Sequence, residues 1–179
     1  AISGIQLDSQ TWSGVIRITG NVYFSPLATL TIDPGTKIIF EKRSDLVDTD
    51  WTELADNFVK SHNDPTGRKG YKATHYTLRA KIIAQGTAEQ PILFTSGEAQ
   101  PEYADWDMLV LLSDSVLDHV EIAYAHNGAY IEGNNVTIRN SKLHDSLWSC
   151  IDIVSVNNLI ENNEIYHCWR QAVGVKKIG

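Results

Sequence analysis

The chain has 179 residues, enough for one domain with a continuous apolar core. Its formal net charge of −7 argues against a nucleic-acid partner, because nucleic-acid-binding domains usually carry a basic patch. No apolar run approaches the roughly 20 residues that span a bilayer, so we expect no membrane span. Since the chain lacks an initial methionine and stops within a strand pattern at VGVKKIG, we expect a domain cut from a longer protein.

Four short strands are predicted early in the chain. They are separated by Gly20, Pro26 and Pro34–Gly35, residue types that favour turns. We interpret residues 1–14 as a lead-in that covers the open end of the strands, with Trp12 as a plug. The predicted strands occupy residues 15–18, 22–24, 30–32 and 37–40.

Two insertions interrupt this pattern. The first, residues 43–79, contains a predicted short amphipathic helix within residues 48–62, DTDWTELADNFVKSH. The second, residues 97–107, is acidic and offers carboxylates that could ligate calcium. It lacks the spaced Asp, Asn and Gly of a dedicated calcium loop, so we expect solvated carboxylates there. These side chains are Glu102, Asp105 and Asp107.

The last third of the chain repeats one pattern, with a period of 21 and then 22 residues. The segments SDSVLDHVEI, NNVTIRNSKL and NNLIENNEI align when Ile122, Leu143 and Ile165 share a column. A fixed period of this size indicates stacked units that cannot bury an apolar face alone. A helix-bearing leucine-rich repeat is the competitor, but no unit contains ten residues of helical periodicity. The β-branched, Asn-rich units therefore favour stacked parallel strands.

The alignment produces further columns. Two of them alternate in charge sign, and opposite charges on neighbouring strands stabilise their pairing. A polar column contains asparagines, which can hydrogen-bond to one another along a stack. The charged columns are Asp118/Arg139/Glu161 and Glu121/Lys142/Glu164, the added apolar columns are Leu117/Ile138/Ile160 and Ile131/Ile153/Val175, and the polar column is His119/Asn140/Asn162.

These Asn-rich units, with LTIDPGTKIIF at 30–40 and IIAQGTAEQPILFTS at 82–96, resemble the right-handed parallel β-helix of the pectate-lyase-like superfamily. The resemblance implies an all-β solenoid in a single domain over residues 1–179, with a helix-containing insertion. Counting three strands per coil gives about five coils. The resemblance also implies a secreted or cell-surface protein. It predicts fold better than activity, because the superfamily contains lyases, hydrolases, epimerases, adhesins and inert spacers.

The two cysteines fall in different columns of this register. Cys150 faces Ala172, whereas Cys168 faces Ser146 and Ala125. Because the neighbours are small, we favour two unreacted thiols in the core. A disulfide between adjacent coils is the alternative, which an extracellular setting would permit. No Cys/His cluster has the spacing of a zinc site, so no metal ligand is assigned.

Aromatic and polar residues gather at one predicted corner of the last coils. Flat rings suit the C–H faces of sugars, and polar neighbours can bind their hydroxyls. A histidine beside an aspartate could act as a general base, and an arginine could pair with a uronate carboxylate. The alternative is that some of these rings point into the core. The candidate substrate-binding residues are Tyr124, His126, His144, Asp145, Trp148, Tyr166, His167, Trp169 and Arg170.

Two functions fit these features. The first is a secreted or cell-surface module that binds a polysaccharide or other surface glycan, or serves as a structural element. The second is a polysaccharide-degrading lyase or glycoside hydrolase that acts at the aromatic corner. Lyases of the superfamily use calcium-binding aspartates with a basic residue, and its hydrolases use clustered carboxylates. The sequence reproduces neither arrangement, so no catalytic residue is assigned. We predict no cofactor, with calcium as the one metal to test, and expect end-to-end self-association through an uncovered last coil.

Overall fold

The chain folds into parallel β-strands that return to the same positions turn after turn. The computed structural model describes residues 1–41 and 76–176, which form seventeen strands and no helix. Every strand pair in these residues is parallel, as the sequence predicts. None of the described segments is a helix that could cross a membrane. The helix expected within residues 48–62 lies outside the described residues.

Three sheets run along the stack, and successive turns add strand segments to each of them. The front sheet consists of β1 (Ile2–Gln6), the end of β3 (Val15–Phe24), the start of β6 (Leu78–Gln85), β8 (Trp106–Leu111), β11 (Ala125–Ile131), β14 (Ser149–Ile153) and β17 (Gln171–Val175). The rear sheet consists of β2 (Gln10–Trp12), β4 (Thr29–Ile32), the end of β6, β9 (Val116–Asp118), β12 (Thr137–Arg139) and β15 (Leu159–Glu161). The side sheet consists of the start of β3, β5 (Lys37–Phe40), β7 (Ile92–Ser96), β10 (Val120–Ala123), β13 (Lys142–Ser146) and β16 (Glu164–Cys168).

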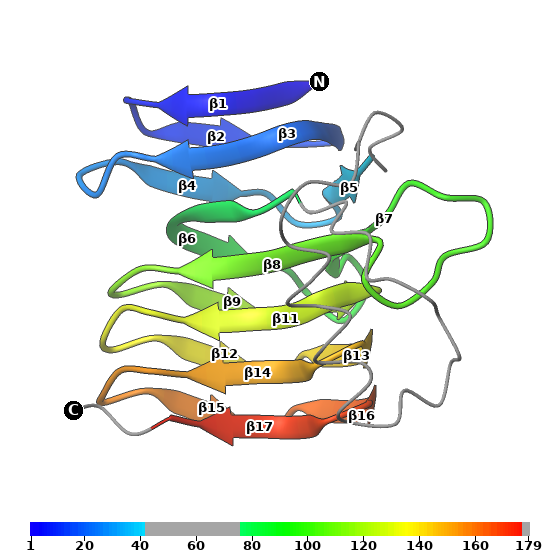
Figure 1. The fold of residues 1–179 in the computed structure, drawn as a ribbon. Helices are drawn as coiled ribbons and strands as arrows, with labels where there is room; N and C mark the ends of the chain where they lie inside the picture. The colour runs from blue at the N-terminus through cyan, green and yellow to red at the C-terminus, as the bar shows by residue number, and fades with distance from the viewer. Residues whose placement is uncertain (42–75, 177–179) are drawn as a thin grey trace, which may run out of the picture.

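The hand of the coil can be followed in Figure 1. The front strands run from right to left and the rear strands from left to right, while the chain descends from its N-terminus to its C-terminus. This winding is a right-handed coil, the hand expected when crossovers join parallel strands of one sheet. The side sheet closes the third face, so each turn encloses a narrow interior.

Residues with a left-handed backbone make many of the bends between the sheets. In the last three complete turns, nine such residues have φ between 50° and 65°. Most are Asn, Asp or His, which tolerate this conformation better than most other side chains. The repeated asparagines therefore meet a backbone requirement, and Asn140 donates a hydrogen bond to Asp118 (3.0 Å) rather than joining an asparagine ladder. The nine residues form the columns Asp114/Asn135/Asn157, His119/Asn140/Asn162 and Tyr124/Asp145/His167.

The register predicted from the repeat is confirmed. Leu143 pairs with Ile122 on one side and with Ile165 on the other. Arg139 lies between Asp118 and Glu161, and its Nε donates a hydrogen bond to Asp118 Oδ2 (2.8 Å). Alternation of charge sign therefore has a direct structural cause, because each charged residue meets its equivalents in the turns before and after it.

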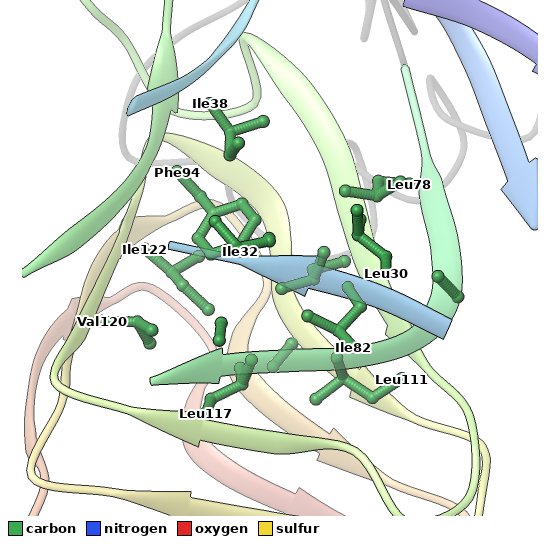
Figure 2. Close-up of a cluster of buried hydrophobic side chains, with 14 of the residues drawn as sticks. Leu30, Ile32, Ile38, Leu78, Ile82, Phe94, Leu111, Leu117, Val120 and Ile122 are labelled. Carbon is green, nitrogen blue, oxygen red and sulfur yellow. The ribbon is translucent and has the colours of Figure 1, made fainter. Parts of the chain in front are cut away.

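Buried aliphatic and aromatic side chains fill the interior of the coil. Figure 2 shows Leu30, Leu78 and Phe94 drawn into one cluster from different turns, and all three are fully buried. Removing each such side chain from water contributes about 1.5–3 kcal/mol to folding. Leu143 is also fully buried, whereas Ile165 is only half-buried because no described strand follows β16 in the side sheet.

The interpretation of residues 1–14 as a lead-in is wrong. They form β1 and β2, which pair with β3 and β4 and so belong to the stack. The sequence did not reveal these strands because the segment is too short to show a repeat. In the structure, Ile2, Ile5 and Trp12 all pair with residues of the next turn. Trp12 is 4% exposed, and its ring meets that of Phe24 edge-on at 5.9 Å. It is thus a core residue of the first described turn.

Both insertions are shorter than the sequence suggests. Leu78 and Arg79 already belong to β6, so the first interruption ends before them. Trp106 begins β8 and is fully buried against Phe40, with ring centroids 4.0 Å apart. Neither boundary is visible in the sequence, because the flanking residues Tyr76 and Asp107 are polar and continue the composition of a loop.

The prediction of two free thiols is also wrong, because Cys150 and Cys168 form a disulfide with their Cα atoms 5.5 Å apart. Cys168 does lie opposite Ser146, as the register predicts. Cys150 lies around the corner on β14, and the bend between β13 and β14 brings the two columns together across successive turns. The bond links β14 to β16.

Substitutions in one apolar column test the stacking directly. We expect Ile138→Ala to lower the free energy of unfolding by about 3–4 kcal/mol, because Ile138 is fully buried between Leu117 and Ile160. Ile160→Ala removes the same atoms from a half-buried position and should lower it by only about 1–2 kcal/mol. Urea denaturation of both variants measures the difference, and equal losses would contradict the half-buried position of Ile160 in the last described turn.

Candidate functional site

The predicted site residues lie at the corner between the side sheet and the front sheet, in three successive turns. At this corner Tyr124, Asp145 and His167 occupy equivalent positions, each with a left-handed backbone. A bulky residue such as Tyr124 rarely adopts this conformation, which costs roughly 1–2 kcal/mol. The residues just before them stack as well, since His144 pairs with Ala123 and with Tyr166. The repeat therefore superimposes the polar and aromatic residues of each turn.

One group, which we name the His144 cluster, contains Glu121, Tyr124, His144, Asp145, Tyr166 and His167. His144 is 8% exposed, and both of its ring nitrogens lie against carboxylates. Its Nδ1 is 2.7 Å from Asp145 Oδ2, and its Nε2 is 3.3 Å from Glu121 Oε1. The other oxygen of Asp145 is 3.1 Å from Nδ1 of His167. Four charged or polar side chains from three turns therefore form one chain of hydrogen bonds.

Aromatic rings enclose His144 on two sides. Tyr166 stacks on it with a centroid distance of 4.7 Å and an interplanar angle of 3°. Tyr124 meets it edge-on at 6.2 Å, and His167 meets Tyr166 edge-on at 5.1 Å. These contacts fix the orientation of the rings before any ligand arrives, which lowers the entropy that binding must remove. They also occupy one face of Tyr166.

The carboxylates control the protonation of His144. Burial lowers the pKa of His144, but hydrogen bonds to Glu121 and Asp145 outweigh burial and raise the pKa above 6.5. The hydrogen bond from His144 in turn lowers the pKa of Glu121 below 4.5. Burial, with the nearby Asp145 and Glu121 carboxylates, raises the pKa of Tyr124. Because carboxylates engage both ring nitrogens of His144, neither nitrogen is free to act as a general base, and the ring joins two turns through Glu121 and Asp145.

The second group, which we name the Trp148 stack, contains Asp107, His126, Trp148 and Arg170. The Arg170 guanidinium carbon lies 4.0 Å from the centroid of a Trp148 ring, a cation–π contact. His126 lies on this stack too, 6.0 Å from Trp148 between ring centroids. Asp107 Oδ1 is 3.4 Å from His126 Nδ1, and its other oxygen accepts a hydrogen bond from Thr77 (2.8 Å). Arg170 is exposed.

Eight of the nine predicted site residues fall into these two groups, and Trp169 does not. Trp169 is half-buried between His167 and Arg170 in the chain, and its backbone N–H donates to Ser146 O (3.1 Å). Within the part of the chain that the structure describes, no ring contact joins it to either group. The alternative that the rings fill the core is wrong for the His144 cluster, because Leu143 and Ile165 on the same strands take the inward positions.

The sequence did not indicate two members of the site, Glu121 and Asp107. Glu121 was assigned to a charge column with Lys142, but its carboxylate reaches His144, the diagonal neighbour on the next strand. Asp107 and Asp105 were expected to be solvated. Instead, Asp107 binds Thr77, and Asp105 is buried and accepts hydrogen bonds from Ser96 Oγ (2.8 Å) and the Glu102 N–H (2.9 Å). The signal that could have identified them is their outward position beside histidines of the next turn.

Asp145 and Asp152, the carboxylate pair nearest to a hydrolase arrangement, bind different partners. Asp145 lies between two histidines. Asp152 is fully buried, and its Oδ2 accepts hydrogen bonds from Asn127 Nδ2 (3.2 Å) and Lys176 Nζ (3.1 Å). Among residues 1–41 and 76–176, no group of three or more His, Cys, Asp or Glu side chains is arranged to hold a metal ion. The expectation of no cofactor, with calcium as the one metal to test, stays a prediction.

Comparison with known proteins extends this description. A family model described as a pectate-lyase like beta helix domain matches residues 5–142, more than half of the chain. No curated protein matches the chain, and no solved structure matches it either. The matched region ends at Lys142, so it includes Tyr124 and His126 but not Trp148 or Tyr166.

The His144 cluster predicts a defined dependence of stability on pH. Because the pKa of His144 is raised in the folded state, its contribution is complete below about pH 6.5 and is lost as pH rises through the raised pKa. The lowered pKa of Glu121 adds stability above about pH 4.5 that is lost as pH falls through the lowered value. NMR titration should therefore show a His144 pKa above 6.5 that decreases in Glu121→Gln.

The same variant supplies the thermodynamic check. Glu121→Gln should destabilise the protein more at pH 6 than at pH 9, because only protonated His144 benefits from the carboxylate. A His144 resonance that titrates at or below the ordinary histidine value, or a destabilisation independent of pH, would show that the two side chains are not coupled.

Proposed function

Because the chain belongs to the pectate-lyase-like β-helix family, we propose that it is a secreted or cell-surface module that binds a polysaccharide along the corner formed by the His144 cluster and the Trp148 stack. The observation that carries the proposal is the contact between Arg170 and Trp148, with the guanidinium 4.0 Å from the ring centroid. Beside it, Tyr166 is stacked on His144 at 4.7 Å. Oriented rings with a rim of hydrogen-bonding groups are the arrangement that sugar ligands need.

Three features make this corner suited to an extended ligand. The groups repeat along the stack at the spacing of parallel strands, about 4.8 Å, so they form a strip rather than a pocket. Aromatic and charged side chains alternate along that strip, from Tyr124 and His126 to Tyr166 and Arg170. Their mutual contacts hold these side chains in place, so the protein would lose little conformational entropy on binding. Most of the ordering cost of association would fall on the flexible polymer.

The chemistry of the rim favours an acidic glycan. Arg170 uses the face of its guanidinium on Trp148, which leaves the N–H edge for a carboxylate. His167 is also exposed, with 66% of its side chain accessible. The carboxylates of Glu121 and Asp145 are already bound to His144, so they oppose an anionic ligand less than free carboxylates would.

Secretion is supported by the disulfide. Cys150 and Cys168 would be kept reduced in a reducing compartment, where disulfides are rare. The bond secures the last described turn, which carries Tyr166 and Arg170, to the turn before it. The module would therefore hold its site rigidly in an oxidising extracellular setting.

Calorimetric titration with uronate-containing and neutral polysaccharides tests the binding. We expect Trp148→Ala and Tyr166→Ala each to weaken binding of the acidic polymer about tenfold, or ~1.4 kcal/mol, as buried aromatic anchors do. Tyr23→Ala is the matched control, because Tyr23 is 39% exposed in the front sheet of an early turn and should leave affinity unchanged. Absence of binding to every polymer would refute the proposal and leave a structural module.

One observation favours an enzyme as the second candidate. Asp145 Oδ1 is 3.1 Å from Nδ1 of the exposed His167, so the carboxylate can fix the tautomer and leave Nε2 available as a base. Acidic polymers would be assayed for unsaturated product and neutral polymers for new reducing ends. We expect neither product, that is, binding without turnover. Product that disappears in both His167→Ala and Asp145→Ala would establish the enzyme instead. Product that survives both substitutions would place the activity elsewhere.

A further inference from the structure

A buried carboxylate in the front sheet lies between two nitrogen atoms that come from different turns. Asp152 in β14 is fully buried, although its neighbours Ile151 and Ile153 take the inward positions of that strand. Its Oδ2 accepts hydrogen bonds from Asn127 Nδ2 (3.2 Å) in β11 and from Lys176 Nζ (3.1 Å), which follows β17. Figure 1 shows β11, β14 and β17 one below another in the front sheet. An amine and a carboxamide therefore meet at one carboxylate oxygen.

Two glycines let the backbone approach this group closely. Gly174 pairs with Asp152, and a Cβ atom at position 174 would lie 2.5 Å from Asp152 Oδ1. The glycine therefore leaves the room that the carboxylate occupies. Gly128 follows Asn127, where the pairing of β11 with β8 becomes irregular, and a Cβ atom at position 128 would lie 2.4 Å from Cys150 O. The backbone is thus fitted to the three polar side chains that converge here.

Asp152 does not have the full set of partners that a buried carboxylate needs. Its Oδ1 has no hydrogen-bond donor in the part of the chain that the structure describes. A buried carboxylate oxygen without a donor destabilises the folded state, because it has lost the water that solvated it. The amine of Lys176 also lies 5.2 Å from the centroid of the Tyr130 ring, which covers it on one side. A reaction that neutralised both Asp152 and Lys176 would remove this cost.

We propose that Lys176 and Asn127 form an isopeptide bond within the chain, with Asp152 as the group that transfers the protons. The amine of Lys176 attacks Cγ of Asn127, as activated lysines attack other carbonyl carbons. The new amide joins the turn that contains β11 directly to the turn that contains β17, across the intervening β14. The product is a covalent link between turns, additional to the disulfide.

Bond formation begins with a proton transfer to Asp152. The carboxylate takes one proton from the Lys176 ammonium, which leaves a lone pair on Nζ; burial favours this transfer, because it converts two charged groups into two neutral ones. Nζ then forms a bond to Cγ of Asn127, and negative charge develops on Asn127 Oδ1. The backbone N–H of Ser149 already donates to that oxygen (3.4 Å), where a fixed donor stabilises the developing charge.

Release of ammonia completes the reaction. Asp152, which already accepts a hydrogen bond from Asn127 Nδ2, gives its proton to that nitrogen and takes a second proton from Nζ of Lys176. The bond between Cγ and Nδ2 breaks, and ammonia leaves. Of the three ammonium protons, one stays on the new amide nitrogen, one leaves with ammonia and one remains on Asp152. The products are a neutral amide and a neutral carboxylic acid, so no uncompensated charge stays buried.

Mass spectrometry of the intact, reduced 179-residue chain tests the proposal. We expect a mass lower than that of the sequence by one molecule of ammonia, and a branched tryptic peptide that contains Asn127 and Lys176. Peptide mapping is needed because a succinimide at Asn127–Gly128 also releases ammonia. Trypsin separates Asn127 from Asp152 by cleavage at Arg139, so the two possible partners of Lys176 are distinguishable.

Three results overturn the proposal. The first is the unreduced mass of the full sequence. The second is a loss of ammonia without a branched peptide, which would indicate the succinimide. The third is a loss of water with Asp152 in the branched peptide, which would show that Lys176 bonds to the carboxylate instead of to Asn127.

Variants separate the covalent bond from the ion pair. Lys176→Arg keeps a positive charge beside Asp152 without the amine, and Asp152→Asn keeps the shape of the side chain without the proton acceptor, so both should have the full mass of their sequences. Lys142→Arg is the matched control, because Lys142 forms an ion pair with Glu164 (3.4 Å) and should leave the loss of ammonia unchanged. Lys176 is partly exposed, so Lys176→Arg keeps the test valid if Asp152→Asn fails to fold. Loss of ammonia that persists in Lys176→Arg overturns the proposal.

Discussion

In-register pairing of parallel strands from successive turns is the constraint on which the rest of the structure depends. Equivalent residues meet at about 4.8 Å, so each side chain must be compatible with its counterparts above and below. Apolar residues satisfy this by forming columns such as Ile122/Leu143/Ile165, and charged residues satisfy it by alternating in sign. The asparagines satisfy a different requirement, since they occupy bends whose left-handed backbone other residues resist.

The candidate site is a product of the same stacking. His144 and Tyr166 are parallel because they are paired residues of adjacent strands, and Trp148 and Arg170 lie one turn apart at the same corner. The cluster departs from a simple stack at His144, whose two ring nitrogens reach carboxylates of different turns. That arrangement engages both ring nitrogens of His144 and leaves His167 as the more exposed histidine of the cluster.

Several bonds hold the last described turn to the turn before it. The disulfide between Cys150 and Cys168 joins β14 to β16, and Lys176 reaches back to the buried Asp152. The Asp145–His167 contact adds a link at the site itself. These connections compensate for the half-buried apolar residues of that turn, and they keep the candidate site in a fixed shape.

The sequence alone determined the period, the parallel register and the composition of the corner, because a repeat aligns residues that meet along a strand ladder. Only the tertiary structure decided which residues meet across a bend or on a diagonal. It paired Cys150 with Cys168, brought Glu121 to His144 and Asp107 to His126, and added β1 and β2 to the stack. An alignment compares equivalent positions, whereas these contacts depend on the angle of each bend and on side-chain rotamers, which no spacing in the sequence records.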